Sequence, residues 1–240
     1  MFKNRVIFLF LFLVTIQVFS QKSISVVYKV SPLNGTYENS EIIKSSPNKN
    51  HYLGVDEALN KISYELLVSD TIATFRILQT LDFSTRENRM AKNVSGGIEY
   101  FAQKNSLYYF SDLIGERFKV KVENLVWETT KETQIISGYK CYKAIAKKYN
   151  PSKRINKYFD IIAWFCPSIP ISYGPKESIG LPGLVLQYQD DKVVFLAEKI
   201  NFQSDKRISS NFNKKYKEIW EAEYSVMVKE KTLKFYYDKL

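Results

Sequence analysis

The chain has 240 residues, with 35 lysines and arginines against 25 aspartates and glutamates, one histidine and two cysteines. These counts exclude a multi-histidine metal site and a zinc site of four thiolates, and only His51 could serve a serine–histidine–aspartate triad. With 45 % apolar and 25 % charged residues, the composition is that of a folded protein of one domain, or at most two small ones.

The first twenty residues have the pattern of a secretory signal peptide. Lys3 and Arg5 precede an apolar stretch over residues 6–14, and the small residue Ser20 follows. The alternative is a membrane anchor, but the stretch is shorter than the roughly 20 apolar residues that span a bilayer. We therefore expect residues 1–20 to be removed, leaving an exported chain, periplasmic or secreted, without a transmembrane segment. Its net charge is then +8 instead of +10, because two basic residues leave with the peptide.

The first half of the mature chain predicts short strands separated by polar loops. Residues 35–50 and Asp82–Gly97 are polar and lack periodicity, so we expect loops there, and Val55–Lys61 predicts a short helix. β-Branched and aromatic residues dominate the remaining segments. The predicted strands are Ser23–Val30, Tyr64–Val68, Thr71–Leu78, Ile98–Gln103, Ser106–Phe110, Arg117–Val122 and Val126–Thr129.

The second half predicts further strands and one helix. The strands cover residues 134–146, Lys157–Phe165, Leu184–Tyr188 and Val193–Lys199. Apolar residues at i+3 and i+4 spacing predict a helix over about 211–236, which Ser209, Ser210 or Asn211 could cap. Residues 21–240 thus predict a single, mainly β domain: a curved antiparallel meander sheet, an open half-barrel or barrel-like, with a C-terminal helix.

The two cysteines lie on successive predicted strands, and their positions predict a register. If the strands form a hairpin in which paired residue numbers sum to 307, Cys141 lies opposite Cys166, and Lys147 opposite Asp160. Opposed strand residues have Cα atoms about 4.5–5.5 Å apart, which suits a disulfide. Since an exported protein meets oxidising conditions, we predict a Cys141–Cys166 disulfide. The alternative is two buried free thiols.

The same hairpin carries a cluster of basic residues interleaved with tyrosines. One interpretation is a tip that contacts an anion, such as phosphate or an acidic glycan; the other is an ordinary solvated hairpin end. Nucleic acid is not an expected partner of an exported protein. The candidate anion-contact residues are Lys143, Lys147, Lys148, Lys153, Arg154 and Lys157.

Catalytic, cofactor and metal sites find little support in the sequence. His51 lies in a predicted loop, near Asp56 and Glu57, where a solvated side chain is the ordinary interpretation. Asp190 and Asp191 are explained by turn chemistry. Cys141 has no evident activating partner for a nucleophilic role. We predict no catalytic residue, no cofactor and no metal ligand.

One hexapeptide identifies a family. Gly180-Leu181-Pro182-Gly183-Leu184-Val185 resembles the motif of the GLPGLI family, exported proteins of Bacteroidota, and the segment 138–144 resembles a second family motif. Lys176 stands where the family usually has an aromatic residue, and Cys166 where a small residue is expected. The resemblance implies an envelope location and no established activity. Pro182 and Gly183 also suit the central positions of a type II turn, with Leu181 and Leu184 in the core. The alternative is the rim of a binding site.

Together these features favour an exported, non-enzymatic envelope protein that binds an envelope protein, lipid or glycan, or an apolar ligand. The alternatives are a hydrolase with an unrecognised carboxylate site and a structural partner of an outer-membrane receptor system.

Overall fold

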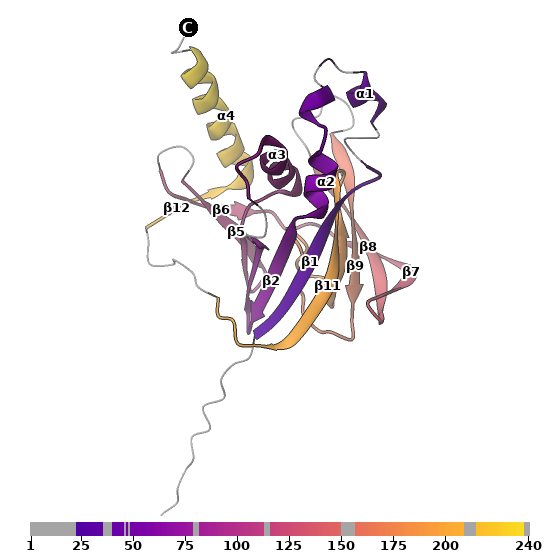
Figure 1. The fold of residues 1–240 in the computed structure, drawn as a ribbon. Helices are drawn as coiled ribbons and strands as arrows, with labels where there is room; N and C mark the ends of the chain where they lie inside the picture. The colour runs from indigo at the N-terminus through magenta and orange to yellow at the C-terminus, as the bar shows by residue number, and fades with distance from the viewer. Residues whose placement is uncertain are drawn as a thin grey trace, which may run out of the picture.

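One twelve-stranded sheet dominates the computed structural model, which describes residues 23–35, 40–45, 47, 49–78, 82–112, 116–149, 157–208 and 215–237. The strand order is β12-β6-β5-β4-β3-β2-β1-β11-β10-β9-β8-β7. Among the described residues, β12 pairs with β6 in parallel and the other neighbouring strands pair antiparallel. Since β12 and β7 end the order, the described sheet is open, and the prediction of a mainly β fold with a curved open sheet is confirmed (Figure 1). The strands are β1 (Ser23–Pro32), β2 (Ser63–Ser69), β3 (Ile72–Leu78), β4 (Tyr100–Gln103), β5 (Ser106–Ser111), β6 (Phe118–Val122), β7 (Glu128–Ile136), β8 (Tyr139–Tyr149), β9 (Tyr158–Cys166), β10 (Leu184–Gln189), β11 (Val193–Ser204) and β12 (Lys217–Trp220).

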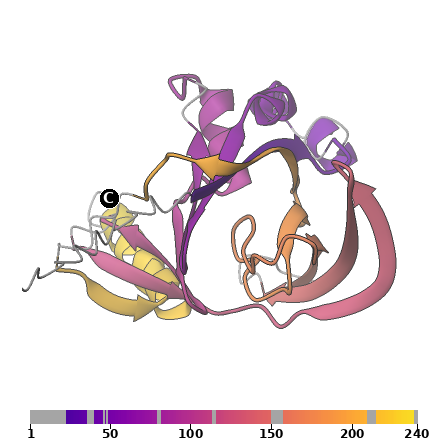
Figure 2. The same ribbon diagram turned by 90° about the horizontal axis from the view of Figure 1, so that it is seen from below.

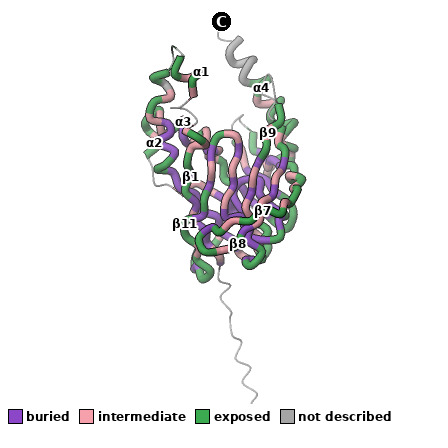
Figure 3. The backbone as a smooth tube through the Cα atoms, turned by 90° about the vertical axis from the view of Figure 1, so that its right-hand side faces the viewer, coloured by how far each residue is buried: buried purple, intermediate pink, exposed green. Residues whose placement is uncertain are grey.

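The sheet curls around residues 167–183, the segment between β9 and β10, which we call the plug. Figure 2 shows the strands as most of a ring with this segment, in orange, inside it. Residues 173–179 are all buried. Along the strands, buried and more exposed residues alternate over long stretches (Figure 3), as expected for a sheet with one face toward a core.

Aromatic side chains fill much of the inner face of the sheet. Tyr64 stacks on Phe75 with ring centroids 5.0 Å apart, and Phe195 meets Tyr64 edge-on at 5.2 Å. Tyr28 is fully buried, and its hydroxyl donates to the Val185 carbonyl at 2.7 Å, which ties β1 to β10. Such aromatic pairs contribute about 0.5–1.5 kcal/mol each beyond the burial of their area.

The helices differ from the sequence prediction in two places. The predicted loop over Asp82–Gly97 is wrong, because α3 (Arg86–Ser95) lies within it, capped by Thr85, whose side chain accepts from the Asn88 backbone N–H. The helix predicted from about 211 instead begins at α4 (Glu221–Tyr237), and the four preceding residues form β12. The candidate caps Ser209, Ser210 and Asn211 lie outside the described residues.

The other helices are short. α2 (Val55–Asn60) covers the predicted helix and buries Leu59 fully, whereas α1 (Glu41–Lys44) and the 3₁₀ helix Lys49–His51 lie within the predicted loop 35–50. No helix among the described residues has the length and apolarity needed to cross a membrane. The predicted signal peptide, residues 1–20, lies outside the described residues.

The β8–β9 hairpin has the predicted register. Ala144 lies opposite Ala163, Ile145 opposite Ile162, and Lys147 opposite Asp160, so the paired numbers sum to 307. The cysteines at the end of this ladder are nevertheless free and buried, and the disulfide prediction is corrected.

Each thiol has another partner. The Cys141 thiol donates to the Tyr139 carbonyl at 3.6 Å, and Cys166 lies 3.0 Å from the Ser168 hydroxyl. Burial, and then the neighbouring Cys166, raise the pKa of Cys141 to about 12. Burial thus keeps the Cys141 side chain as a neutral thiol in the folded protein.

The family motif forms a tighter turn than predicted. The Gly183 N–H donates to the Leu181 carbonyl at 2.8 Å, an i to i+2 bond, and the Leu184 N–H donates to the Ile169 carbonyl at 2.9 Å. Gly183 has a φ of 157°, far from the +80° of a type II turn. The type II prediction is therefore wrong, although the burial of Leu181 and Leu184 is confirmed.

Candidate functional site

The outer face of β4, β5, β6 and β12 carries an unusual number of aromatic side chains. Phe101 pairs with Tyr108, and Tyr108 pairs with Lys121, which pairs in turn with Trp220, so these side chains share one face. The opposite face presents Tyr100, Leu107 and Val120 to the core. We call Phe101, Tyr108, Phe110, Tyr216 and Trp220 the aromatic strip.

The rings of the strip contact one another. Phe110 lies 4.4 Å from Tyr216 and 5.3 Å from Phe101, measured between centroids, and Phe101 stacks on Tyr108 at 5.8 Å. Tyr216 precedes β12, so the aromatic contact ties the segment before that strand to β5. Because these rings pack on the side of the sheet away from the core, they form a second apolar cluster rather than part of the first.

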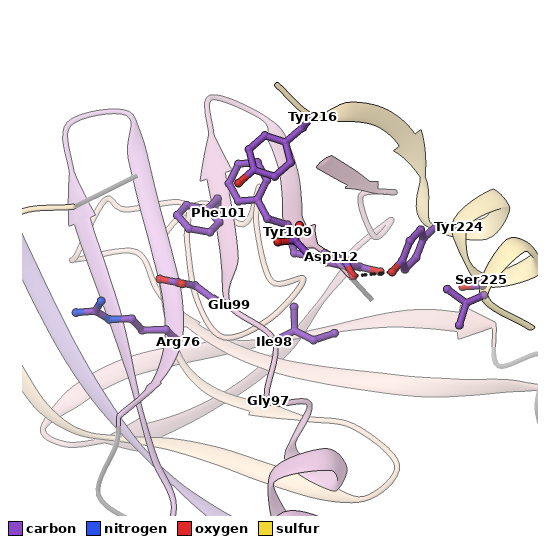
Figure 4. Close-up of a pocket in the computed structure, with 13 residues that line it drawn as sticks. Arg76, Gly97, Ile98, Glu99, Phe101, Tyr109, Asp112, Tyr216, Tyr224 and Ser225 are labelled. Atoms are coloured by element: carbon purple, nitrogen blue, oxygen red, sulfur yellow. Dashed lines mark hydrogen bonds between the residues drawn. The ribbon is translucent and has the colours of Figure 1, made fainter. Parts of the chain in front are cut away.

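A groove of about 930 Å³ lies beside the strip, between the sheet and α4. We call it the first groove (Figure 4). Phe101, Phe110 and Tyr216 form an aromatic wall, and Ile98 and Val228 add apolar surface. Its other lining residues include Arg76, Glu99, Ser111, Asp112, Tyr224 and Ser225.

Charged and polar groups border this groove. In Figure 4, Arg76 and Glu99 lie side by side, and the Ser111 and Tyr224 hydroxyls are 2.5 Å apart. Partial burial raises the pKa of Glu99, while Arg76 acts to lower it. A groove with an aromatic wall and a few polar groups is the usual form of a small-molecule site.

A buried carboxylate anchors the sheet behind Arg76. Glu65 is fully buried and accepts from the Lys206 ammonium at 2.6 Å and the Ser25 hydroxyl at 2.7 Å, with Arg76 at 3.5 Å. Burial acts to raise the pKa of Glu65, but the bonds from Lys206 and Ser25, together with the charges of Lys206 and Arg76, lower it overall. The cluster fixes the chain after β11 across the outer face of β2.

Buried charges also hold the plug in place. Lys176 pairs with Asp190 at 2.7 Å, and both side chains are nearly inaccessible. Glu177 contacts the Lys148 ammonium and accepts from the Tyr188 hydroxyl at 3.0 Å. Burial acts to raise the pKa values of Glu177 and Asp190, but the neighbouring lysines lower both. The departure at Lys176 from the family pattern is thus matched by a buried partner.

The candidate anion-contact lysines lie in different surroundings. Lys143 pairs with Glu132 at 3.0 Å, Lys147 with Asp160 at 3.1 Å, and Lys148 with the buried Glu177. Lys157 lies over the Tyr149 ring, 6.0 Å from its centroid, at the exposed end of the hairpin. Lys153 and Arg154 lie outside the described residues. The described lysines are not brought together around one point.

The family-motif residues mainly pack, with one exposed exception. Gly180 has a φ of +84°, and Leu181, Gly183, Leu184 and Val185 are buried. Pro182 is exposed and lines a cavity of about 520 Å³ together with Tyr142 and Phe165. The motif thus spans the end of the plug and the start of β10, and its single proline reaches the surface.

Among the described residues, no group of three or more His, Cys, Asp or Glu side chains is arranged to hold a metal ion. The aromatic strip was not identified from the sequence. Consecutive aromatic residues in Leu107-Tyr108-Tyr109-Phe110 are the signal that could have indicated it, because a strand with aromatics on both faces has two apolar surfaces.

Comparisons with known proteins give a family match and a fold. Residues 147–187, which include β9, the plug and the hexapeptide, match a family described as "Protein of unknown function (Porph_ging)". No curated protein matches the chain.

Among solved structures, PNGF-II in a C2 crystal form has a TM-score of 0.51 and 16 % identity over 86 % of this chain and 32 % of PNGF-II. Its P21 form has a TM-score of 0.49 over 86 % and 33 %. The Mycobacterium tuberculosis lipoprotein LppX has a TM-score of 0.28 and 9 % identity over 75 % of this chain and 87 % of its own. The first likeness shows a shared fold alone, and this chain spans about a third of PNGF-II.

Proposed function

We propose that this protein is an exported, non-enzymatic envelope protein of the GLPGLI type that binds an envelope component through the aromatic strip and the first groove. The export pattern in residues 1–20 and the hexapeptide Gly180–Val185 support the location. The family match over residues 147–187 is compatible with this assignment.

The aromatic wall of the first groove carries the proposal. Phe101, Phe110 and Tyr216 line a space of about 930 Å³, which the core residues Tyr109 and Tyr224 also border. Large apolar surfaces away from the core commonly mark interaction sites. Arg76, Glu99 and Asp112 at the same groove favour a ligand with polar groups beside its apolar part.

The space inside the curl gives little support to an internal apolar ligand. The void between the plug and the sheet, next to Phe75, Tyr100 and Tyr173, is about 10 Å³. That is roughly the volume one water molecule needs. The outer face is therefore the better candidate surface.

The alternatives find weaker support. For a hydrolase, the buried Glu65, Glu177 and Asp190 are each bound by lysine. The carboxylates that could act on a substrate are then Glu99 and Asp112 at the first groove. An anion contact at the β8–β9 tip remains a proposal for Lys157, with Lys153 and Arg154. A structural role beside an outer-membrane receptor would appear as a protein captured by crosslinking in cells.

Purification from the envelope after gentle extraction tests the proposal. Mass spectrometry of the wild-type protein should identify a co-purifying small molecule, lipid or glycan. The Tyr216→Ala variant should co-purify with much less of this ligand, because the groove loses part of its aromatic wall. The matched control is Phe202→Ala, since Phe202 is 45 % exposed on β11 and does not line the groove. Equal recovery with all three proteins, or none with the wild type, would refute the proposal.

A further inference from the structure

A second groove of about 620 Å³ lies on the other side of the aromatic strip, over β5, β6 and β12 and the β4–β5 turn. We infer that this second groove binds an acidic oligosaccharide, with Trp220 as the surface on which a sugar ring stacks. The inference rests on the proposed role of the strip as a binding surface and adds to it a ligand class and a separate site.

The aromatic residues of the groove are fixed by the sheet. Tyr108, Lys121 and Trp220 lie opposite one another on three consecutive strands. The Lys121 ammonium is 5.8 Å from the centroid of the Trp220 ring, which is nevertheless 48 % exposed. A sugar ring has an apolar face of C–H groups, and a partly open indole on a strand is a rigid surface for it to cover.

Glu218 fixes two cations between the aromatic rings. Its two carboxylate oxygens accept from Lys119 at 3.1 Å and from Lys121 at 2.5 Å, and Lys119 lies 4.5 Å from the centroid of the Tyr108 ring. The bonds from Lys121 and Lys119 lower the pKa of Glu218, while burial opposes them with a smaller effect. Each ammonium therefore has a fixed position and retains N–H groups for a hydroxyl or a carboxylate of a ligand.

Hydrogen-bonding side chains complete the groove. Gln103, Asn105 and Asn124 line it, and Asn124 donates to the Asn105 carbonyl at 2.8 Å, which fixes the turn. The Tyr173 hydroxyl of the plug donates to the Thr71 carbonyl at 2.9 Å and lies 3.4 Å from the Lys104 carbonyl of the same turn. Groups held in place in this way bind a ligand without a large ordering cost.

The charges of the groove favour an acidic ligand over a neutral one. Lys104, Lys119 and Lys121 line it against Glu123 and Glu218, so one positive charge is in excess. An apolar lipid chain fits less well, because lysines, amides and glutamates alternate with the two aromatic rings. The lysines, amides and aromatic rings of the groove together suit a hydroxyl-rich chain that carries a carboxylate.

Calorimetric titration of the full-length protein tests the inference, with trigalacturonic acid as the acidic probe and maltotriose as the neutral one. We expect trigalacturonic acid to bind more tightly, and its affinity to fall with added salt. Trp220→Ala should weaken binding about tenfold, as for loss of a central aromatic contact, while Phe202→Ala should bind like the wild type. Urea unfolding of each variant establishes that it is folded.

The outcomes separate this inference from the proposed function. If Tyr216→Ala loses the saccharide and Trp220→Ala keeps it, the first groove is the site, and the inference is overturned while the proposed function stands. Equal affinity for the two saccharides overturns the acidic ligand class. If neither saccharide binds, or if the protein binds only phosphatidylglycerol vesicles, the saccharide site is overturned. The proposed function is then still decided by whether a ligand co-purifies with the protein.

Discussion

Removing the charge of Asp190 should destabilise the protein strongly. The Lys176 and Asp190 side chains are only 8 % and 11 % exposed, and their ion pair is 2.7 Å long. Asp190→Asn leaves the Lys176 ammonium buried beside a neutral amide. Breaking a buried pair in this way costs about 3–5 kcal/mol of the free energy of unfolding. For a domain of this size, that corresponds to a fall in Tm of about 6–20 °C.

Asparagine is the informative replacement, because Asp190 has two roles. One carboxylate oxygen accepts from the backbone N–H groups of Lys192 and Val193 at 2.8 and 2.9 Å, while the other binds Lys176. The amide oxygen of asparagine can keep the turn bonds, so the loss reports the charge. The control is Lys147→Met, which removes an exposed pair with Asp160 and should cost about 1 kcal/mol or less.

A double variant and a pH series sharpen the measurement by urea unfolding. Lys176→Met with Asp190→Asn should be more stable than Asp190→Asn alone, since no buried charge is left unpaired. Because Lys176 lowers the pKa of folded Asp190, the stabilisation is present above the unfolded pKa of about 3.9 and disappears as the pH falls through the lower folded value. The difference between wild type and Asp190→Asn should therefore shrink in acid. A double variant no more stable than Asp190→Asn would refute the reasoning.

Two further predictions concern the plug and the thiols. The pKa of Cys141 is raised to about 12, so this thiol should react very slowly with a thiol reagent at pH 8 in the folded protein. Two thiols should react once the unreduced chain is unfolded. If no thiol reacts after unfolding, the cysteines are not free. A Cβ at Gly183 would overlap the Cys166 carbonyl, so Gly183→Ala should lower the urea midpoint by the equivalent of about 1–3 kcal/mol. The control is Gly180→Ala, where the added Cβ meets open space but φ is +84°. It should lower the free energy of unfolding by about 1–2 kcal/mol through backbone strain alone. A Gly183→Ala variant as stable as the wild type would disprove the close approach.

The β8–β9 hairpin could be predicted in detail because its information is local. Lys147 opposite Asp160 and Ile145 opposite Ile162 satisfy charge and apolar pairing in one register only, and the structure has that register. The two cysteines are free although the register is right. Their side chains are neighbours and also contact the Tyr139 carbonyl and the Ser168 hydroxyl, so opposed Cα positions alone do not determine whether a disulfide forms.

The errors arose where tertiary contacts decide the structure. α3 is polar along most of its length, but Met90, Ala91 and Val94 form a narrow apolar face on the core. This short period, together with the cap Thr85 and the glycine at 96, is the signal that could have indicated the helix. At β12, Ile219 and Trp220 fit a helical spacing, yet this stretch pairs in parallel with β6. That pairing joins segments about a hundred residues apart, and no local pattern reports it.

The buried ion pairs and the aromatic strip divide the molecule into a scaffold and a surface for recognition. The hexapeptide lies in the scaffold, because Gly183 is needed for close approach to β9, its leucines are buried, and the adjacent Lys176 and Glu177 are neutralised inside the curl. Phe101, Tyr108 and Phe110 lie on the face of their strands opposite the core, and Phe101 and Tyr108 are themselves buried there. A strand that needed only one buried face would carry polar residues at these positions. Changes in the plug, or at the buried Phe101 and Tyr108, should therefore alter stability first. Changes at the more exposed Tyr216 and Trp220 should alter binding first.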